Sequence, residues 1–323
     1  MARAGAVTPS TGDFFVCDFF GASPKHDLAS MEHPLFSLST RPDRRILSYS
    51  HNDVAITVTP SVRGRATIFD ADILIFCISQ LMAALNAGRS VLTLTAHDLL
   101  LATGRETSGD SYRRLKEAFE RLAGTRITTN IVTGDHEVTM GFGLIENWEI
   151  VRKTRAGRMV SVSVTLSEWL YQAVLDRSVL TLNRDYFGLR KPLERRLYEL
   201  ARKHCGQQRS WRVSVDTLLK KSGSNSPRRV FRAMVRDVVT RDSLPDYRFE
   251  EEPGDMMVVT RKGLVIEPGA GLVLKPETLE EARALMPGAD IYALEAEWQS
   301  FAAKRPPRAP DAAFLGWVRQ RAG

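Results

Sequence analysis

The sequence has few cysteines, and no pairing pattern among them. Its 323 residues include three, Cys17, Cys77 and Cys205, and none stands in a CxxC or CxxH spacing. An odd, scattered set fits neither a disulfide framework nor a zinc module. We therefore expect reduced thiols, no metal site and no cofactor.

Long apolar runs and a secretory signal are also missing. The longest apolar run, Ile73 to Ile78, ends at Ser79 and Gln80, whereas a membrane helix needs ~18 apolar residues or more. The start of the chain, MARAGAVTPSTGD, lacks the apolar stretch of a secretory signal. These absences predict a soluble, cytoplasmic protein with no membrane partner.

Enzyme signatures are absent as well. The chain has no GxxxxGK(S/T) phosphate loop, no GxSxG element, and no HxH or HExxH set among its six histidines. We therefore expect no catalytic residues and no enzymatic activity.

Charge, by contrast, is concentrated in one region. The whole chain carries a net +7, but Arg177 to Arg241 holds seventeen basic and five acidic residues, a net +12, which leaves −5 elsewhere. Ala66 to Ile150 has seven basic and eleven acidic residues. This asymmetry suggests that one region binds a polyanion and another does not.

The chain also contains an internal duplication. Ser111 to Arg121 and Ser226 to Arg236 share the pattern SxRR(L/V)xxA(F/M)xR, and the segments around them repeat in the same order. In each copy we expect a first helix (Asp70 to Ala87; Lys191 to Cys205), a short strand (Val91 to Leu94; Trp211 to Val213) and a second helix capped by Thr95 or Ser214. A third helix capped by Ser111 or Ser226 follows, then a hairpin around a Gly-Asp turn (134–135; 254–255).

This order predicts an α+β fold of two tandem winged helix-turn-helix domains, in which the third helix usually enters the major groove. We divide the chain into an N-terminal extension (1–65) packed on the first unit, a first winged-helix domain (66–180), a second (181–262) and a helical C-terminal tail (263–323). A strand at Arg158 to Leu166 and a Ser-capped helix ending near Arg177 join the two units.

The third helix of the second copy is the main candidate for DNA binding. At ~100° per residue, its arginines share one face, while Val230, Phe231, Met234 and Val238 lie on the opposite side. Arginine can bind guanine bidentately or grip phosphates. A solvated cationic helix is the alternative, although it would leave like charges without acidic partners on the helix. The candidate residues here are Ser226, Arg228, Arg229, Arg232 and Arg236.

The remaining candidates are less specific. In the first copy, Arg113 and Arg114 share their face with Glu117 and Glu120, so backbone contact or a protein interface competes with base reading, and Glu117 can pair with Arg121. For Lys191 and Arg195 of the first helix, phosphate contact and a solvated face are equally open. Arg261 and Lys262 end the second hairpin, where they would contact the minor groove or the phosphates beside it.

Three helices are expected after Gly263, with Trp298, Phe301, Phe314 and Trp317 among their residues. These aromatic side chains would either anchor a partner protein or fold back to complete the core of the second domain.

Three segments carry a family resemblance: MEHPLFSLSTRPDRRILSYSHNDVAITVTPSVRGRATIFDADILIFCISQLM, SYRRLKEAFERLAGTRITTNI and KPLERRLYELARKHCG. Across roughly residues 12 to 262, the chain resembles the RepA-type plasmid replication initiators (replication initiator protein A family). The resemblance implies binding of double-stranded origin repeats (iterons), recruitment of the host initiator and helicase, and a homodimer in some states. It also implies that the C-terminal unit makes the main DNA contact in the major groove, while the first unit serves dimerisation or auxiliary DNA contact. A winged-helix transcriptional repressor and a non-enzymatic interaction scaffold remain the alternatives.

Overall fold

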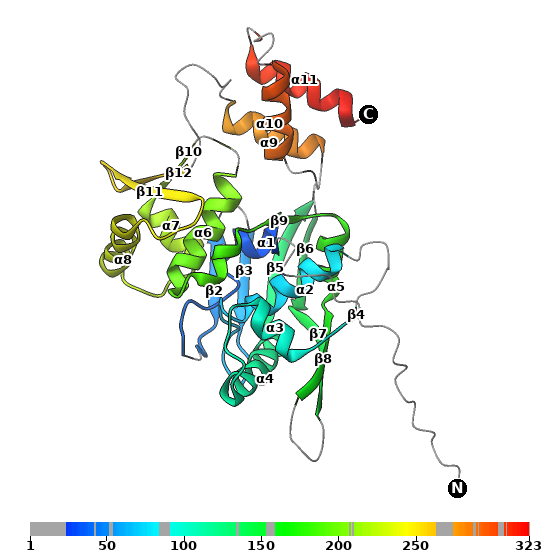
Figure 1. Cartoon of the computed structure of the whole chain (residues 1–323). Coiled ribbons are helices and arrows are strands. Elements are labelled where there is room, and N and C mark those ends of the chain that lie inside the picture. The colour runs from blue at the N-terminus through cyan, green and yellow to red at the C-terminus, as the bar shows by residue number, and fades with distance from the viewer. Residues whose placement is uncertain are drawn as a thin grey trace.

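Figure 1 shows the fold as a computed structural model of the whole chain. The described residues are 24–41, 43–51, 54–83, 91–133, 136–152, 159–206, 208, 210–262, 274–286, 289, 291–302, 307 and 309–322. The expected turn at 134–135, residues 1–23 of the expected extension and the last residues of the first expected helix lie outside them. Within them, no helix is long and apolar enough to cross a membrane.

One antiparallel sheet of the N-terminal part has the strand order β2-β3-β5-β6. Its strands are β2 (Leu47–His51), β3 (Val54–Thr59), β5 (Arg126–Thr133) and β6 (His136–Gly143). Strand β3 pairs with β5 from Ile56 opposite Thr129 to Thr59 opposite Arg126. A segment that precedes residue 65 therefore supplies two strands to the sheet of the first unit.

A second sheet has the order β4-β8-β7. Strand β7 (Ile145–Arg152) follows β6 after one residue and pairs with β8 (Met159–Leu166), while β4 (Val91–Leu94) pairs with the other edge of β8. The expected strand at Arg158 to Leu166 is confirmed as β8, and the expected helix is α5 (Glu168–Leu175), capped by Ser167. A short antiparallel pair joins β1 (Lys25–Asp27) to β9 (Val179–Thr181).

Helix α2 (Ala71–Ala83) occupies the centre of the N-terminal part, and every residue from Ala71 to Leu81 is buried. A helix that is apolar around nearly its whole circumference belongs inside a core. It packs against β1, α3 (Ala96–Ala102) and α5. Helix α4 (Gly109–Gly124) and the short α1 (Leu28–Glu32) complete this part.

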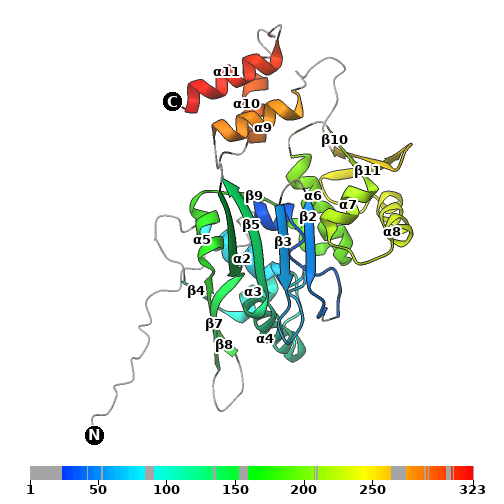
Figure 2. The same cartoon turned by 180° about the vertical axis from the view of Figure 1, so that it is seen from behind.

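The second unit begins after a 3₁₀ turn, η2 (Arg184–Gly188). Its elements are α6 (Pro192–His204), β10 (Ser210–Ser214), α7 (Val215–Ser222), α8 (Arg228–Arg241), β11 (Tyr247–Glu252) and β12 (Met256–Arg261). The three strands form one antiparallel sheet in the order β10-β12-β11. The turn between β11 and β12 places Gly254 at φ +80° and Asp255 at φ +59°, as expected for a Gly-Asp hairpin turn. The predicted order of elements in the second copy is confirmed (Figure 2).

The two copies differ in how their strands pair. In the second copy, β10 pairs with a strand of its own hairpin, whereas in the first copy β4 pairs with β8. The hairpin of the first copy, β5 and β6, instead pairs with β3. Strand β3, which comes earlier in the chain, thus pairs with the edge of β5. The backbone hydrogen-bonding groups of β4 are paired with those of β8 instead.

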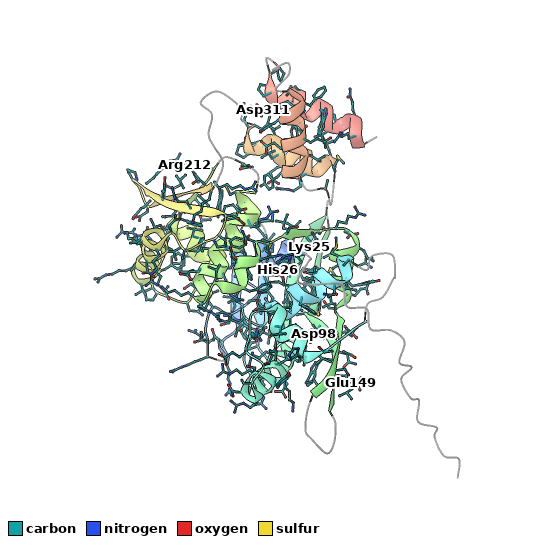
Figure 3. The ribbon with its side chains drawn as sticks, viewed as in Figure 1. Lys25, His26, Asp98, Glu149, Arg212 and Asp311 are labelled. Carbon is teal, nitrogen blue, oxygen red and sulfur yellow. The ribbon has the colours of Figure 1, made fainter. Side chains whose placement is uncertain are left out.

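The C-terminal tail has a core of its own. Its helices are α9 (Pro276–Leu285), α10 (Ile291–Ala302) and α11 (Pro310–Ala322), as the sequence predicted. Trp298 and Phe314 are 2% and 0% exposed and pack together in this separate cluster. Both sequence expectations for these two aromatic residues were therefore wrong, because they are neither available to a partner nor part of the second unit's core. Phe301 is 66% exposed. Figure 3 shows Asp311 in the tail, where it accepts hydrogen bonds from the Lys275 backbone and the Thr278 hydroxyl at 2.8 and 2.7 Å.

Candidate nucleic-acid interface

The local sequence explains the apolar back of α8. Phe231, Val235 and Val238 recur at helical spacing and are all buried, which fixes the helix on the second unit. Val230, expected on the buried side, is instead 48% exposed. The helix begins at Arg228 after Pro227, and Ser226 lies one residue too early to cap it. In α4 the cap is Ser108, so the expected caps at Ser226 and Ser111 were both wrong.

Three of the four arginines on the outer face of α8 have acidic partners from neighbouring elements. Arg228 forms ion pairs with Asp216 of α7 at 2.5 Å and with Asp255 of the hairpin turn at 2.6 Å. Arg232 also pairs with Asp255. The sequence predicted that the arginines of α8 would be unpaired, because the helix itself offers them almost no acidic partner. That prediction was wrong, since the carboxylates come from α7 and from the β11–β12 hairpin.

Arg236 completes this set through a two-pronged contact. Its Nε and Nη2 each donate to a carboxylate oxygen of Glu251 on β11, both at 2.7 Å. These hydrogen bonds lower the pKa of Glu251 and raise that of Arg236. The pairing holds the guanidinium in a defined direction at the surface.

Arg229 is the exception on this face. It is exposed, and no ion pair joins it to any residue that the structure describes. Arg228 and Arg236 also remain about half exposed, at 48% and 55% of the side chain. Ligand oxygens can reach all three guanidiniums, and Arg229 can bind without first giving up a carboxylate.

Two candidates near α8 are engaged within the protein. The Lys191 ammonium lies 2.6 Å from Asp237, which Arg241 also contacts at 2.8 Å. Lys262 donates to the carbonyls of Asp242 and Leu244 at 2.9 and 2.8 Å, at the C-terminal end of α8. Lys262 therefore secures the end of the helix. Arg261, on β12, is exposed.

Arg195 was wrongly expected at the surface. Its side chain is 3% exposed and pairs with Asp72 of α2 at 2.5 Å. The guanidinium lies over the rings of Phe69 and Tyr186, 4.5 and 5.0 Å from their centroids. It cannot reach DNA in this fold, and we remove it from the candidate interface.

The neighbouring Arg196 is also buried. The sequence did not reveal that it joins two helices. Its Nη1 donates to Glu199 at 3.0 Å and to the Ser30 carbonyl at 2.9 Å, so it ties α6 to α1. Glu199 lies in turn 3.9 Å from His26, which is completely buried between the units (Figure 3). Helix α6 is rich in leucine and yet carries three consecutive charged residues, Glu194, Arg195 and Arg196. That pattern is the feature of the sequence that indicates a buried polar contact.

The first copy presents a different surface. Arg113 and Arg114 are 69% and 71% exposed, and both pair with Asp110 of their own helix. Arg121 does not pair with Glu117 as expected, but with Asp70, which it contacts at 2.7 Å. Glu120 pairs with Arg63 at 2.9 Å. Internal carboxylates therefore neutralise much of this helix, and within the described residues no group of His, Cys, Asp and Glu could hold a metal ion.

This arrangement of helices and sheets has a counterpart among solved structures. The crystal structure of domains 2 and 3 of RctB matches with a TM-score of 0.50 and 14% identity, covering 69% of this chain and 92% of that one. A second crystal structure of RctB domains 2–3 matches with a TM-score of 0.49 and 16% identity, covering 71% and 95%. The first likeness concerns the fold alone, and it supports the predicted α+β class.

Sequence relatives are more specific. A protein of Wigglesworthia glossinidia brevipalpis named "Putative replication protein" is 38% identical over 242 residues, which are 73% of this chain and 88% of the relative. The family model described as Replication initiator protein A (RPA) matches residues 25–249. The chain belongs to this family, and the family predicted from the sequence is confirmed.

Proposed function

We propose that this protein is a plasmid replication initiator that binds duplex origin DNA through two winged-helix units, the second of which makes the main contact. The units are 66–180 and 181–262, preceded by the extension and followed by the tail. Family membership supports the replication role. The main support for DNA binding is the outer face of α8, which presents exposed arginines. The opposite face of this helix is apolar and buried, and the β11–β12 hairpin lies beside it.

The arginines of α8 have unequal tasks in this proposal. Arg229, which has no carboxylate partner among the described residues, is the first choice for bidentate contact with a guanine edge. Arg228, Arg232 and Arg236 must each exchange a carboxylate for a phosphate or a base. Breaking the ion pairs lowers the net binding free energy that these arginines contribute on DNA of arbitrary sequence. The ion pairs therefore favour DNA sites whose contacts are good enough to offset this loss.

The rest of the proposal follows from the family and the resemblance stated above. The origin sites are direct repeats (iterons), and the bound protein recruits the host initiator and helicase. The first unit serves dimerisation or auxiliary DNA contact, in keeping with its neutralised α4 surface. The protein acts in the cytoplasm, without catalysis and without a cofactor.

Footprinting on the cognate plasmid tests the function. Protection of direct repeats beside an AT-rich segment is the expected result. Protection of a promoter palindrome alone would support a repressor, and no protection at all would support an interaction scaffold.

The salt dependence of binding tests the electrostatic part of the proposal. With six or more phosphates neutralised, log affinity should fall with log salt at a slope of about −5 or steeper. Fluorescence anisotropy with a labelled duplex at several salt concentrations measures this slope. A slope near zero would contradict the proposal.

A further inference from the structure

A basic loop of the N-terminal part, described at residues 39–41 and 43–46, lies beside the start of α8. Figures 1 and 2 both show the segment that precedes β2 next to the second unit. The Asn225 side chain, three residues before α8 begins, donates to Asp43 Oδ2 at 3.3 Å. A Cβ atom added to Gly223 would lie 2.5 Å from Cβ of Pro34, so the α7–α8 turn packs directly on the same part of the chain.

Asp43 joins this loop to the core and to the α7–α8 turn. It is 7% exposed and accepts from Arg45 Nε at 3.0 Å and from Arg65 Nη2 at 3.3 Å. Its carbonyl also accepts from the Arg65 backbone at 2.7 Å. The Asp43 carboxylate therefore points inward, where it contacts the buried Arg65.

The arginines of the loop face outward. Arg41, Arg44 and Arg45 are all exposed, and the Arg45 side chain is 69% exposed even while it contacts Asp43. Within the described part of the chain, neither Arg41 nor Arg44 forms an ion pair. With Asp43 turned inward and Arg41, Arg44 and Arg45 exposed, the described residues of the loop present a positive surface next to the start of α8.

We propose that this loop is a second contact to the DNA backbone, in which Arg41 and Arg44 bind phosphates of the same duplex that α8 enters. The inference rests on the proposed function and adds to it a contact from the N-terminal part. From Asn225 to Arg228 the chain spans at most ~11 Å, because a fully extended chain covers ~3.3–3.6 Å per residue. The major groove is ~12 Å wide, so a loop held at Asn225 lies within reach of the strand that borders a groove occupied by α8.

Phosphate contacts carry no sequence information, so a 30-bp duplex of mixed sequence is a sufficient probe. The full-length double variant Arg41→Gln/Arg44→Gln is compared with wild type by fluorescence anisotropy at several salt concentrations. Arg319→Gln/Arg321→Gln is the matched control. It removes the same charge from exposed arginines of α11, in a tail that both views place away from α8.

The loop variant should bind about tenfold more weakly at 0.1 M salt, and its slope should be shallower by about 1.8, since each lost phosphate contact removes about 0.9. The control should keep the wild-type slope, and thermal melting of the loop variant should be unchanged. Should the double variant melt early, the single variant Arg44→Gln replaces it, with an expected change in slope of about 0.9.

Three results would overturn the inference. A wild-type affinity and slope in the loop variant, together with a reduced affinity in Arg229→Gln, would show that DNA binds without the loop, and would leave the proposed function standing. An equal loss in loop variant and control would show an effect of overall charge only. Normal DNA binding together with loss of an acidic protein partner would assign the loop to protein contact. A wild-type chain whose binding does not depend on salt would contradict the proposed function itself.

Discussion

Replacing Arg195 with alanine should destabilise the junction between the two units and leave the DNA contact intact. The Arg195 guanidinium is almost fully buried and contacts Asp72 at 2.5 Å. Its Nε donates to the Leu189 carbonyl at 2.9 Å, and its Nη2 to the Phe187 carbonyl at 3.2 Å. The single side chain therefore joins α6, the turn that precedes it, and α2.

The size of the effect follows from what alanine would leave behind. Among the described residues, Asp72, which is 1% exposed, would keep Arg105 as its one cationic partner, at 3.3 Å. Burial already raises the pKa of Asp72, and Arg195 is the strongest influence that opposes it. Removing one partner of a buried pair costs ~3–5 kcal/mol. At ~2–4 °C per kcal/mol for a domain of this size, the melting temperature should fall by roughly 10 °C.

Urea unfolding followed by circular dichroism measures the change. Arg190→Ala, at an exposed position on the same approach to α6, is the control and should stay within ~0.5 kcal/mol of wild type. DNA affinity is measured at a temperature where the variant is fully folded, and it should match wild type. A variant with wild-type stability and a tenfold loss of DNA affinity would show that Arg195 binds phosphate after all.

Three further predictions concern α8 and the tail. Arg229→Ala should cost ~1–3 kcal/mol of binding free energy and relax base preference, while Arg114→Ala should cost less in the same anisotropy assay; equal losses would contradict our view of the first copy. Burial raises the pKa of Glu295 to about 7 from a usual 4.5, so the tail helices should lose roughly 3 kcal/mol of stability as the pH rises from about 4.5 to above 7. Hydrogen exchange, corrected for its intrinsic pH dependence, should show this loss in wild type and not in Glu295→Gln. Truncation after Gly263 should leave cooperative melting and origin binding intact and abolish plasmid replication, because the tail has a separate core; loss of cooperative melting would show that the second unit depends on the tail.

Local pattern in the sequence determined most element types and several ends. Thr95 and Ser214 cap α3 and α7 as predicted, because a hydroxyl that bonds to the backbone two or three residues on needs only its immediate neighbours. The buried stripe of α8 at Phe231 and Val238 was likewise readable from helical spacing. The family was also evident from residues alone, since long segments matched it.

Only the tertiary structure decided which charges meet and which strands pair. Asp216, Asp255 and Glu251 reach the arginines of α8 from other elements, at separations along the chain that no helical wheel contains. The pairing of β3 with β5 also joins segments far apart in sequence. Periodicity reports which face of an element is apolar; it does not report what covers that face. For that reason the buried Arg195 and the separate core of the tail could be identified only once the elements were packed against one another.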